Sequence, residues 1–106
     1  MYKKSKRAFE KSNEVMPGGV NSPVRAFKSV NGDPIFIEKG KGSKIYDIDG
    51  NEYIDYIQGM GPNLFGHSPD FISDLVKKEM DRGYVLAGQF DKEIEIAKMA
   101  LELIPI

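Results

Sequence analysis

The 106-residue sequence predicts an α+β fold, in which an N-terminal helix and a long ordered loop precede a three-stranded antiparallel meander and two C-terminal helices. Three observations support this prediction. Apolar residues recur at helical spacing at both ends of the chain, β-branched and aromatic residues cluster in three short runs between them, and glycine and proline mark the connections.

The first element is a helix over residues 2–16, with Phe9 and Met16 near one face. We interpret the lysine and arginine residues on the opposite face as its solvated side. Pro17-Gly18-Gly19 ends the helix, because proline lacks an N–H donor and glycine permits positive φ. Residues 17–34 then form a loop that is long for a compact domain, and its apolar residues indicate that it is ordered and functional.

Residues 35–57 form the meander, with strands predicted at 35–39, 44–48 and 52–57. Gly40-Lys41-Gly42 separates the first two strands, and Asp49-Gly50 is a strong hairpin signal between the second and third. Connections this short join antiparallel strands.

Two helices follow, over residues 68–82 and 91–104. Ser68-Pro69 opens the first as N-cap and first helical residue, and Asp91 is the expected N-cap of the second, which Pro105 stops. The second helix is apolar over a wide arc that little remaining sequence can cover. We therefore expect the 106 residues to be part of a larger fold.

The composition excludes several classes of function. A net charge of −1 disfavours a dedicated nucleic-acid binder. No cysteine and a single histidine disfavour a thiol nucleophile and a metal site. The sequence has no secretory or membrane-spanning segment, so we expect a soluble, cytoplasmic protein without a membrane partner.

Arg25 is the candidate binding residue, in the loop sequence Asn21-Ser22-Pro23-Val24-Arg25. Its planar guanidinium matches a carboxylate, and Pro23 stiffens the loop that aims it, although a plain surface arginine is the alternative. Gly59-Met60-Gly61 forms either an anion nest or an ordinary turn. We interpret His67 as structural, donating to a loop carbonyl to hold the crossing over residues 59–66. The acidic residues of the meander are assigned to the hairpin, and no residue set defines a reaction.

The loop carries a resemblance to a known family. The run from Pro17 to Phe27 (PGGVNSPVRAF) resembles the N-terminal signature of the glutamate-1-semialdehyde 2,1-aminomutases, which are class III aminotransferases dependent on pyridoxal phosphate. Agreement continues through Tyr46–Tyr56 and more weakly to Pro105. The resemblance implies the N-terminal part of a fold-type I transferase, here a fragment or a truncated product.

The resemblance also implies roles. Arg25 would bind the substrate carboxylate, Ser22 would line the same pocket, and Gly59, Met60 and Gly61 would lie near substrate and cofactor. The family reaction is an isomerisation of glutamate 1-semialdehyde to 5-aminolevulinate for porphyrin biosynthesis, carried out by homodimers. The family's Schiff-base lysine lies further along the chain, so the resemblance assigns no catalytic residue here, and we expect the segment to be inactive alone.

Two departures from the family pattern leave the substrate open, and one of them is His67-Ser68-Pro69, which lacks the second histidine that is more common in the family. Met60 stands where the family usually has tryptophan, which removes a rigid aromatic wall and its N–H donor. A class III aminotransferase for another amino acid is therefore one alternative. A non-catalytic interaction fragment, pairing through the apolar last helix, is the other.

Overall fold

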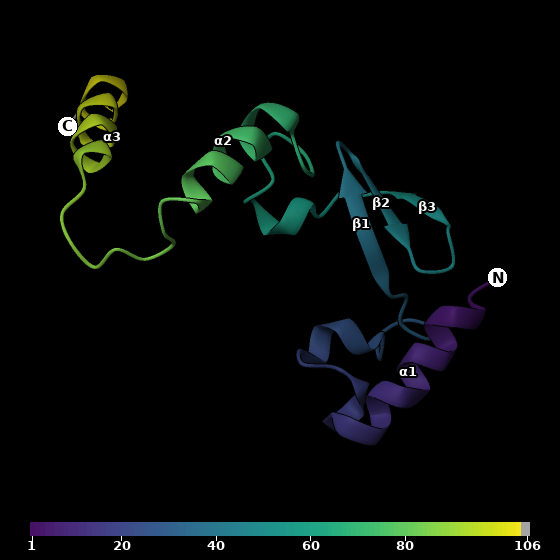
Figure 1. The fold of residues 1–106 in the computed structure, drawn as a ribbon. Helices are drawn as coiled ribbons and strands as arrows, with labels where there is room; N and C mark the ends of the chain where they lie inside the picture. Colours follow the sequence, from purple (N-terminus) through teal and green to yellow (C-terminus); the bar gives the residue numbers. More distant parts are fainter. Residues whose placement is uncertain (105–106) are drawn as a thin grey trace. The chain divides into compact units, whose positions relative to one another are not determined.

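The computed structural model describes residues 1–104 and divides into two compact units, Met1–Ser73 and the part that begins at Asp74. Figure 1 labels the main elements, and the predicted α+β class is confirmed. Three short 3₁₀ turns accompany them. In chain order the elements are α1 (Lys3–Val15), η1 (Pro17–Gly19), η2 (Pro23–Ala26), β1 (Ile37–Lys41), β2 (Lys44–Asp47), β3 (Glu52–Ile54), η3 (Gln58–Met60), α2 (Asp70–Met80) and α3 (Asp91–Leu103).

Helix α1 begins without a capping side chain of its own. The carboxylate of Asp49, in the turn between β2 and β3, accepts the backbone N–H groups of Lys4 and Ser5, both at 2.8 Å. A carboxylate at this end also matches the positive end of the helix dipole. The hairpin turn therefore caps a helix that precedes it by more than 40 residues.

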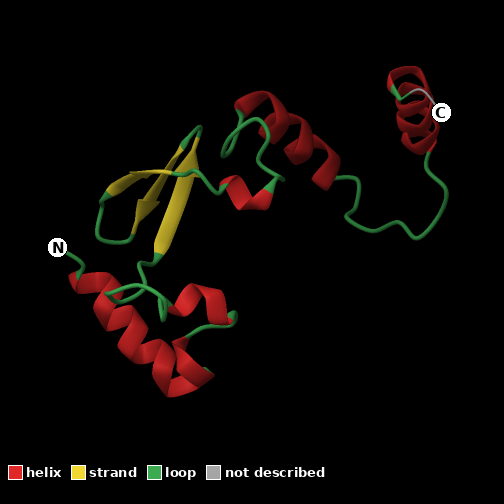
Figure 2. Ribbon diagram, turned by 180° about the vertical axis from the view of Figure 1, so that it is seen from behind, coloured by secondary structure: helices red, strands yellow, loops and turns green. Residues whose placement is uncertain are grey.

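The loop that follows α1 is ordered, and Figure 2 shows its short helical turns beside that helix. Gly19 has φ +70°, and a Cβ there would lie 2.6 Å from Cε2 of Phe9. Only glycine allows both this conformation and this close approach. The loop therefore folds back against the helix.

The sheet is an antiparallel meander in the order β1-β2-β3, as predicted. Strand β1, however, runs over 37–41 and not 35–39, and β3 ends at Ile54 and not at 57. Gly40 pairs with Ile45 and Lys41 with Lys44, so the turn is confined to residues 42 and 43. The assignment of Gly40 and Lys41 to the connection was wrong, because a glycine within a strand resembles a turn signal. In this strand Gly40 allows the side chain of His67 to approach the backbone closely.

Asp47 is fully buried at the end of β2. Its carboxylate accepts hydrogen bonds from the backbone N–H groups of Asp49 and Asn51, the side-chain amide of Asn51 and the Tyr53 hydroxyl. Burial raises the pKa of this carboxyl, but these bonds outweigh burial and hold the pKa below 3.8. The acidic residue thus organises the turn as a charged group.

The two C-terminal helices are shorter than predicted. Ser68 has φ +47°, so the backbone is left-handed just before Pro69 and α2 begins at Asp70. Phe90 is the N-cap of α3, whereas Asp91 is its first residue and accepts the backbone N–H of Lys92. The predicted caps Ser68 and Asp91 were therefore wrong by one or two positions. The predicted stop at Pro105 lies outside the described residues.

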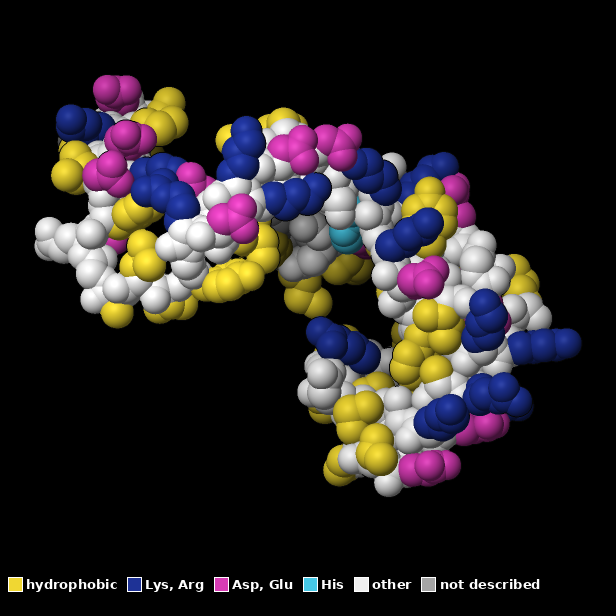
Figure 3. Space-filling view, in the orientation of Figure 1, with side chains coloured by type: hydrophobic (Ala, Val, Ile, Leu, Met, Phe, Trp, Pro, Cys, Tyr) yellow, Lys and Arg dark blue, Asp and Glu magenta, His cyan; other side chains and the backbone are white. Residues whose placement is uncertain are grey.

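Hydrophobic side chains are widely exposed, as the yellow patches in Figure 3 show. Within residues 1–104, the buried residues with apolar side chains are Ala26 and Pro34. On α3 the apolar arc stands open, with Ile94, Leu101 and Ile104 each more than half exposed. No helix in residues 1–104 is long and apolar enough to cross a membrane.

Candidate functional site

Arg25 lines a pocket of about 380 Å³ in the first unit, which we call the Arg25 pocket. Helix α1, the loop after it and the start of β1 all contribute to the wall. The lining residues are Ser12, Met16, Gly19, Val20, Asn21, Arg25, Pro34, Ile35, Phe36 and Ile37. Most of this wall is apolar, so the pocket offers one cationic group beside a hydrophobic surface.

Asn21 orients the Arg25 side chain. The guanidinium Nη1 donates to Oδ1 of Asn21 at 3.0 Å. Its other N–H groups have no protein partner within residues 1–104, and the side chain is exposed. An arginine anchored at one nitrogen with its remaining donors open is suited to bind a carboxylate in two-point fashion.

The backbone presents Arg25 through η2, where Pro23 is the first residue and supplies the required φ. The Arg25 N–H donates to the carbonyl of Ser22 at 3.0 Å. Ser22 is half-buried and is not among the residues that line the pocket. Its assignment as a pocket residue stays a prediction.

The turn at Gln58–Gly61, called here the 58–61 turn, carries the other predicted site residues. All four have positive φ: 47° at Gln58, 67° at Gly59, 63° at Met60 and 115° at Gly61. The Met60 side chain is exposed, and no atom lies within 4 Å of where a Cβ of Gly61 would be. None of these residues lines the Arg25 pocket, so the described contacts do not join the two predicted parts of the site.

His67 supports the 58–61 turn through a carboxylate. Its Nε2 lies 2.6 Å from Oδ2 of Asp55, and its Nδ1 lies 3.3 Å from the side-chain nitrogen of Asn63. Because an amide nitrogen donates, Nδ1 accepts and Nε2 donates to Asp55. The expected partner, a loop carbonyl, was wrong, since the imidazole finds the stronger acceptor. The hydrogen bond from His67 holds the pKa of Asp55 below its usual 3.8.

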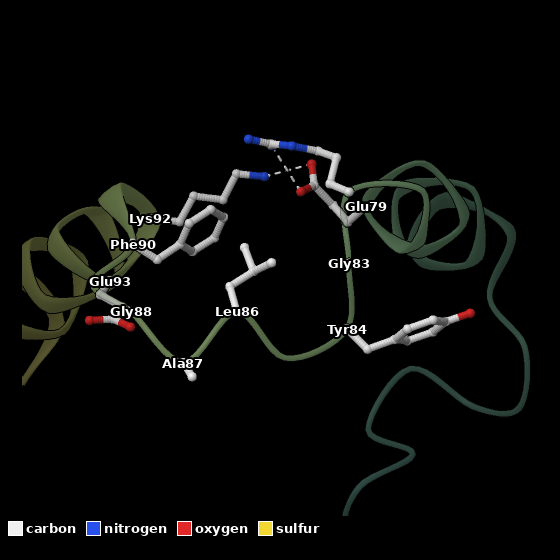
Figure 4. Close-up of a pocket in the computed structure, with 10 residues that line it drawn as sticks. Glu79, Gly83, Tyr84, Leu86, Ala87, Gly88, Phe90, Lys92 and Glu93 are labelled. Carbon is white, nitrogen blue, oxygen red and sulfur yellow. Dashed lines mark hydrogen bonds and ion pairs between the residues drawn. The ribbon is translucent and has the colours of Figure 1, made fainter.

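A second pocket, of about 380 Å³, lies in the second unit (Figure 4). Lys92 reaches Glu79 at 2.7 Å, and Arg82 contacts the same carboxylate at 3.1 Å. Both cations also lie within 6 Å of the centre of the Phe90 ring. Glu79 and Glu93 together balance the two cations in this lining, so this pocket is a weaker anion site than that of Arg25.

The sequence placed Asn21 in the loop beside Arg25, and in the structure Asn21 accepts a hydrogen bond from the Arg25 guanidinium. Sequence reasoning missed Asp55 as a site-forming residue. Asp55 and His67 are 12 residues apart, and their contact depends on the path of the intervening turn.

Both the sequence and the fold of this chain match known proteins. Residues 27–105 match the family model described as Aminotransferase class-III. The chain belongs to the class III aminotransferase family. Membership in this family implies pyridoxal phosphate as the cofactor.

Two relatives and one further structure illustrate the match. A glutamate-1-semialdehyde 2,1-aminomutase 2 of Bacillus licheniformis is 55% identical over 98% of this chain. The chain spans 24% of that relative's length. The β-phenylalanine aminotransferase of Variovorax paradoxus is 31% identical over 96% of this chain and 23% of its own, with a TM-score of 0.81. A transaminase solved with PLP bound shares the fold, with 24% identity, a TM-score of 0.81, and coverage of 96% and 23%.

Proposed function

We propose that this chain forms the N-terminal, substrate-binding portion of a PLP-dependent aminomutase that converts glutamate 1-semialdehyde to 5-aminolevulinate. The observation that carries the proposal is the Arg25 pocket, in a chain 55% identical to a glutamate-1-semialdehyde 2,1-aminomutase. Glutamate 1-semialdehyde has a carboxylate at the end of a short methylene chain. A cation beside an apolar wall complements both parts.

The residues of this chain bind and orient. Arg25 would take the substrate carboxylate with its open N–H donors, while Asn21 restricts the guanidinium to one rotamer. Fixing the cation before binding reduces the entropy that binding costs. Met16 and Phe36 in the pocket wall would contact the methylene groups.

In this proposal pyridoxal phosphate would lie near the 58–61 turn. The position of a Gly61 Cβ is open, and the buried Oε1 of Gln58 has no hydrogen-bond partner in the described residues. The turn therefore has room for a neighbouring polar group, together with an acceptor that such a group can satisfy. The cofactor supplies an electron sink for the reacting carbons. In this proposal the lysine that carries it covalently is not in this chain, so the chain alone does not catalyse the reaction.

The alternatives from the sequence are less well supported. A class III aminotransferase for another amino acid rested on Met60, and a non-catalytic fragment rested on the apolar arc of α3. The aminomutase relative matches across 98% of the chain, including both regions. The proposal retains the homodimer and the cytoplasmic location expected from the resemblance.

The test replaces the matching segment of the Bacillus licheniformis aminomutase with this chain and measures turnover of glutamate 1-semialdehyde. In this chimera we expect activity, and we expect Arg25→Ala to weaken substrate affinity. Loss of a charge-assisted hydrogen bond costs about 1.5–3 kcal/mol, which corresponds to about a 10- to 150-fold rise in KM. Arg25→Lys keeps the charge but loses the fork, and is expected to lie between the two.

The matched control is Arg7→Ala, which removes another exposed arginine from the first unit. Its KM is expected to equal that of the unchanged chimera. If Arg25→Ala and Arg7→Ala behaved alike, Arg25 would not bind the substrate. A chimera that folds and binds PLP but does not convert glutamate 1-semialdehyde would reject the aminomutase assignment.

A further inference from the structure

The 58–61 turn is held in a conformation that its own sequence disfavours. Four consecutive residues have positive φ, and two of them, Gln58 and Met60, are not glycine. Such a conformation persists only where the surrounding structure determines it, and such strain gathers at functional sites. The contacts around the turn therefore need to be identified.

We propose that the His67–Asp55 pair is a positioning device, which holds the 58–61 turn in its strained conformation through contacts to its first residue, Gln58. That the turn faces substrate and cofactor rests on the function proposed above. Neither residue is proposed to contact the reacting atoms. Their effect on the reaction is carried by the turn.

Asp55 holds the start of the turn. One carboxylate oxygen, Oδ1, accepts the backbone N–H groups of Ile57 at 2.8 Å and Gln58 at 3.2 Å. The other, Oδ2, accepts Nε2 of His67 at 2.6 Å. The Gln58 side-chain amide donates back to the Asp55 carbonyl at 2.9 Å. One carboxylate thus joins the first residues of the turn to a residue that follows it.

His67 reaches Gln58 through Asn63 and is itself fixed to the turn between β1 and β2. Its backbone N–H and carbonyl both bond with Gly42, each at 2.8 Å. Its Nδ1 accepts the side-chain amide of Asn63, whose backbone N–H donates to the Gln58 carbonyl at 3.2 Å. His67 therefore connects the β1–β2 turn, the 58–61 turn and Asp55.

Gly40 makes room for this arrangement. A Cβ on Gly40 would lie 2.5 Å from Cγ of His67, and its φ is not in the left-handed region. The glycine is thus required by the imidazole and not by the backbone of β1. The side chains of His67 and Asp55 are only 20% and 10% exposed. The other charged groups close to this segment, Lys41 and Asp70, pair with each other, and Lys41 also donates to the Ser68 carbonyl.

The test is hydrogen exchange and chemical shift measurement by NMR on the labelled 106-residue chain. The first reporters are the amides of Met60, Asn63 and Gly66, which donate to the carbonyls of Ile57, Gln58 and Asn63. The second are the Cα and Cβ chemical shifts of Gln58 and Met60, which report the φ angles of these two residues. In His67→Ala we expect the three amides to exchange at least about tenfold faster, because the turn opens locally. The amides that join β1 and β2 should keep their rates.

Two further variants separate positioning from general loss of structure. Asp55→Asn keeps the shape of the side chain and should free the turn as His67→Ala does. His67→Gln places an amide donor near the position of Nε2 and should restore slow exchange. Asp33→Asn, an exposed aspartate of the same unit, is the matched control and should change nothing.

A pH profile gives an independent readout. The pKa of Asp55 lies below 3.8, so its carboxylate is charged throughout the neutral range. The turn signals should therefore move as Asp55 is protonated, below pH 3.8. In Asp55→Asn this transition should be absent.

The proposal is overturned if the turn amides exchange at wild-type rates in both His67→Ala and Asp55→Asn. It is equally overturned if both variants lose the sheet amides, because the pair would then hold the whole hairpin. None of these measurements involves substrate or cofactor, so their outcome is independent of the Arg25 test. In the chimera, His67→Ala should lower kcat by about 10- to 100-fold with little change in KM, and His67→Gln should restore it.

Discussion

Ser5 gives the most direct test of how the Arg25 pocket is built. Its side chain is buried at 1% exposure, and its Oγ accepts the backbone N–H of Phe36, a residue of the pocket wall, at 3.2 Å. Ser5→Ala removes this acceptor and also the hydroxyl that hydrogen-bonds the Asp49 carboxylate at the start of α1. An orphaned buried donor costs about 1–3 kcal/mol, and the length of this bond places the loss near 1–2 kcal/mol.

The assay is urea unfolding of the chain followed by circular dichroism, with amide exchange at Phe36 as the local readout. We expect a lower midpoint with an unchanged slope, and faster exchange at Phe36 than in the unaltered chain. Ser29→Ala, at an exposed serine, is the control. If Ser5→Ala and Ser29→Ala had equal stability within about 0.5 kcal/mol, the hydroxyl would not join α1 to the pocket wall.

Three more predictions concern the hairpin. Gly40→Ala should destabilise the chain by about 1–3 kcal/mol, because the added Cβ displaces His67. Gly88→Ala is the control and should not destabilise the chain, because the nearest atom to its added Cβ is 3.8 Å away. Thermal unfolding of the two variants compares these effects. The folded-state pKa of Asp47 lies below 3.8, so its stabilising effect is complete above pH 3.8 and is lost as the pH falls through the folded-state value. Acid unfolding should therefore be less steep in Asp47→Asn, and an unchanged curve would contradict this assignment. Tyr53→Phe removes a hydroxyl that donates to Asp47 and should raise the Asp47 pKa, as measured by carboxyl ¹³C shifts; an unmoved titration would show that the hydroxyl contributes nothing.

Local patterns predicted the elements well, because each depends on residues close in sequence. Asp49-Gly50 forms the turn it indicates, and Gly50 has φ +88°. The loop after α1 is ordered as expected, with Pro23 at the start of η2. Gly40 misled the strand assignment because its role is set by an imidazole 27 positions further along the chain.

The site depended on contacts that local patterns do not encode. Arg25 was identified from residue type and loop stiffness, and the structure places it in a pocket. Its partner Asn21 lies four residues earlier in the same loop, where the sequence already placed it beside Arg25. By contrast, the Asp49 carboxylate caps a helix 44 or 45 residues earlier, and no periodicity or motif carries that pairing.

The acidic residues of the meander hold two segments outside the sheet, which are the start of α1 and the 58–61 turn. The Asp47 carboxylate makes its hydrogen bonds within its own hairpin, and the bond from the Asp49 N–H fixes the path of the chain there. That path directs Asp49 to the start of α1, the helix that supplies one wall of the Arg25 pocket. Asp55, just after β3, reaches His67 and the 58–61 turn. Since each carboxylate accepts backbone N–H groups that have no other acceptor, removing one should loosen its own loop and leave the other in place. Asp49 and Asp55 therefore stabilise two separate parts of the structure, and substitutions at these two positions should have additive effects on the free energy of unfolding.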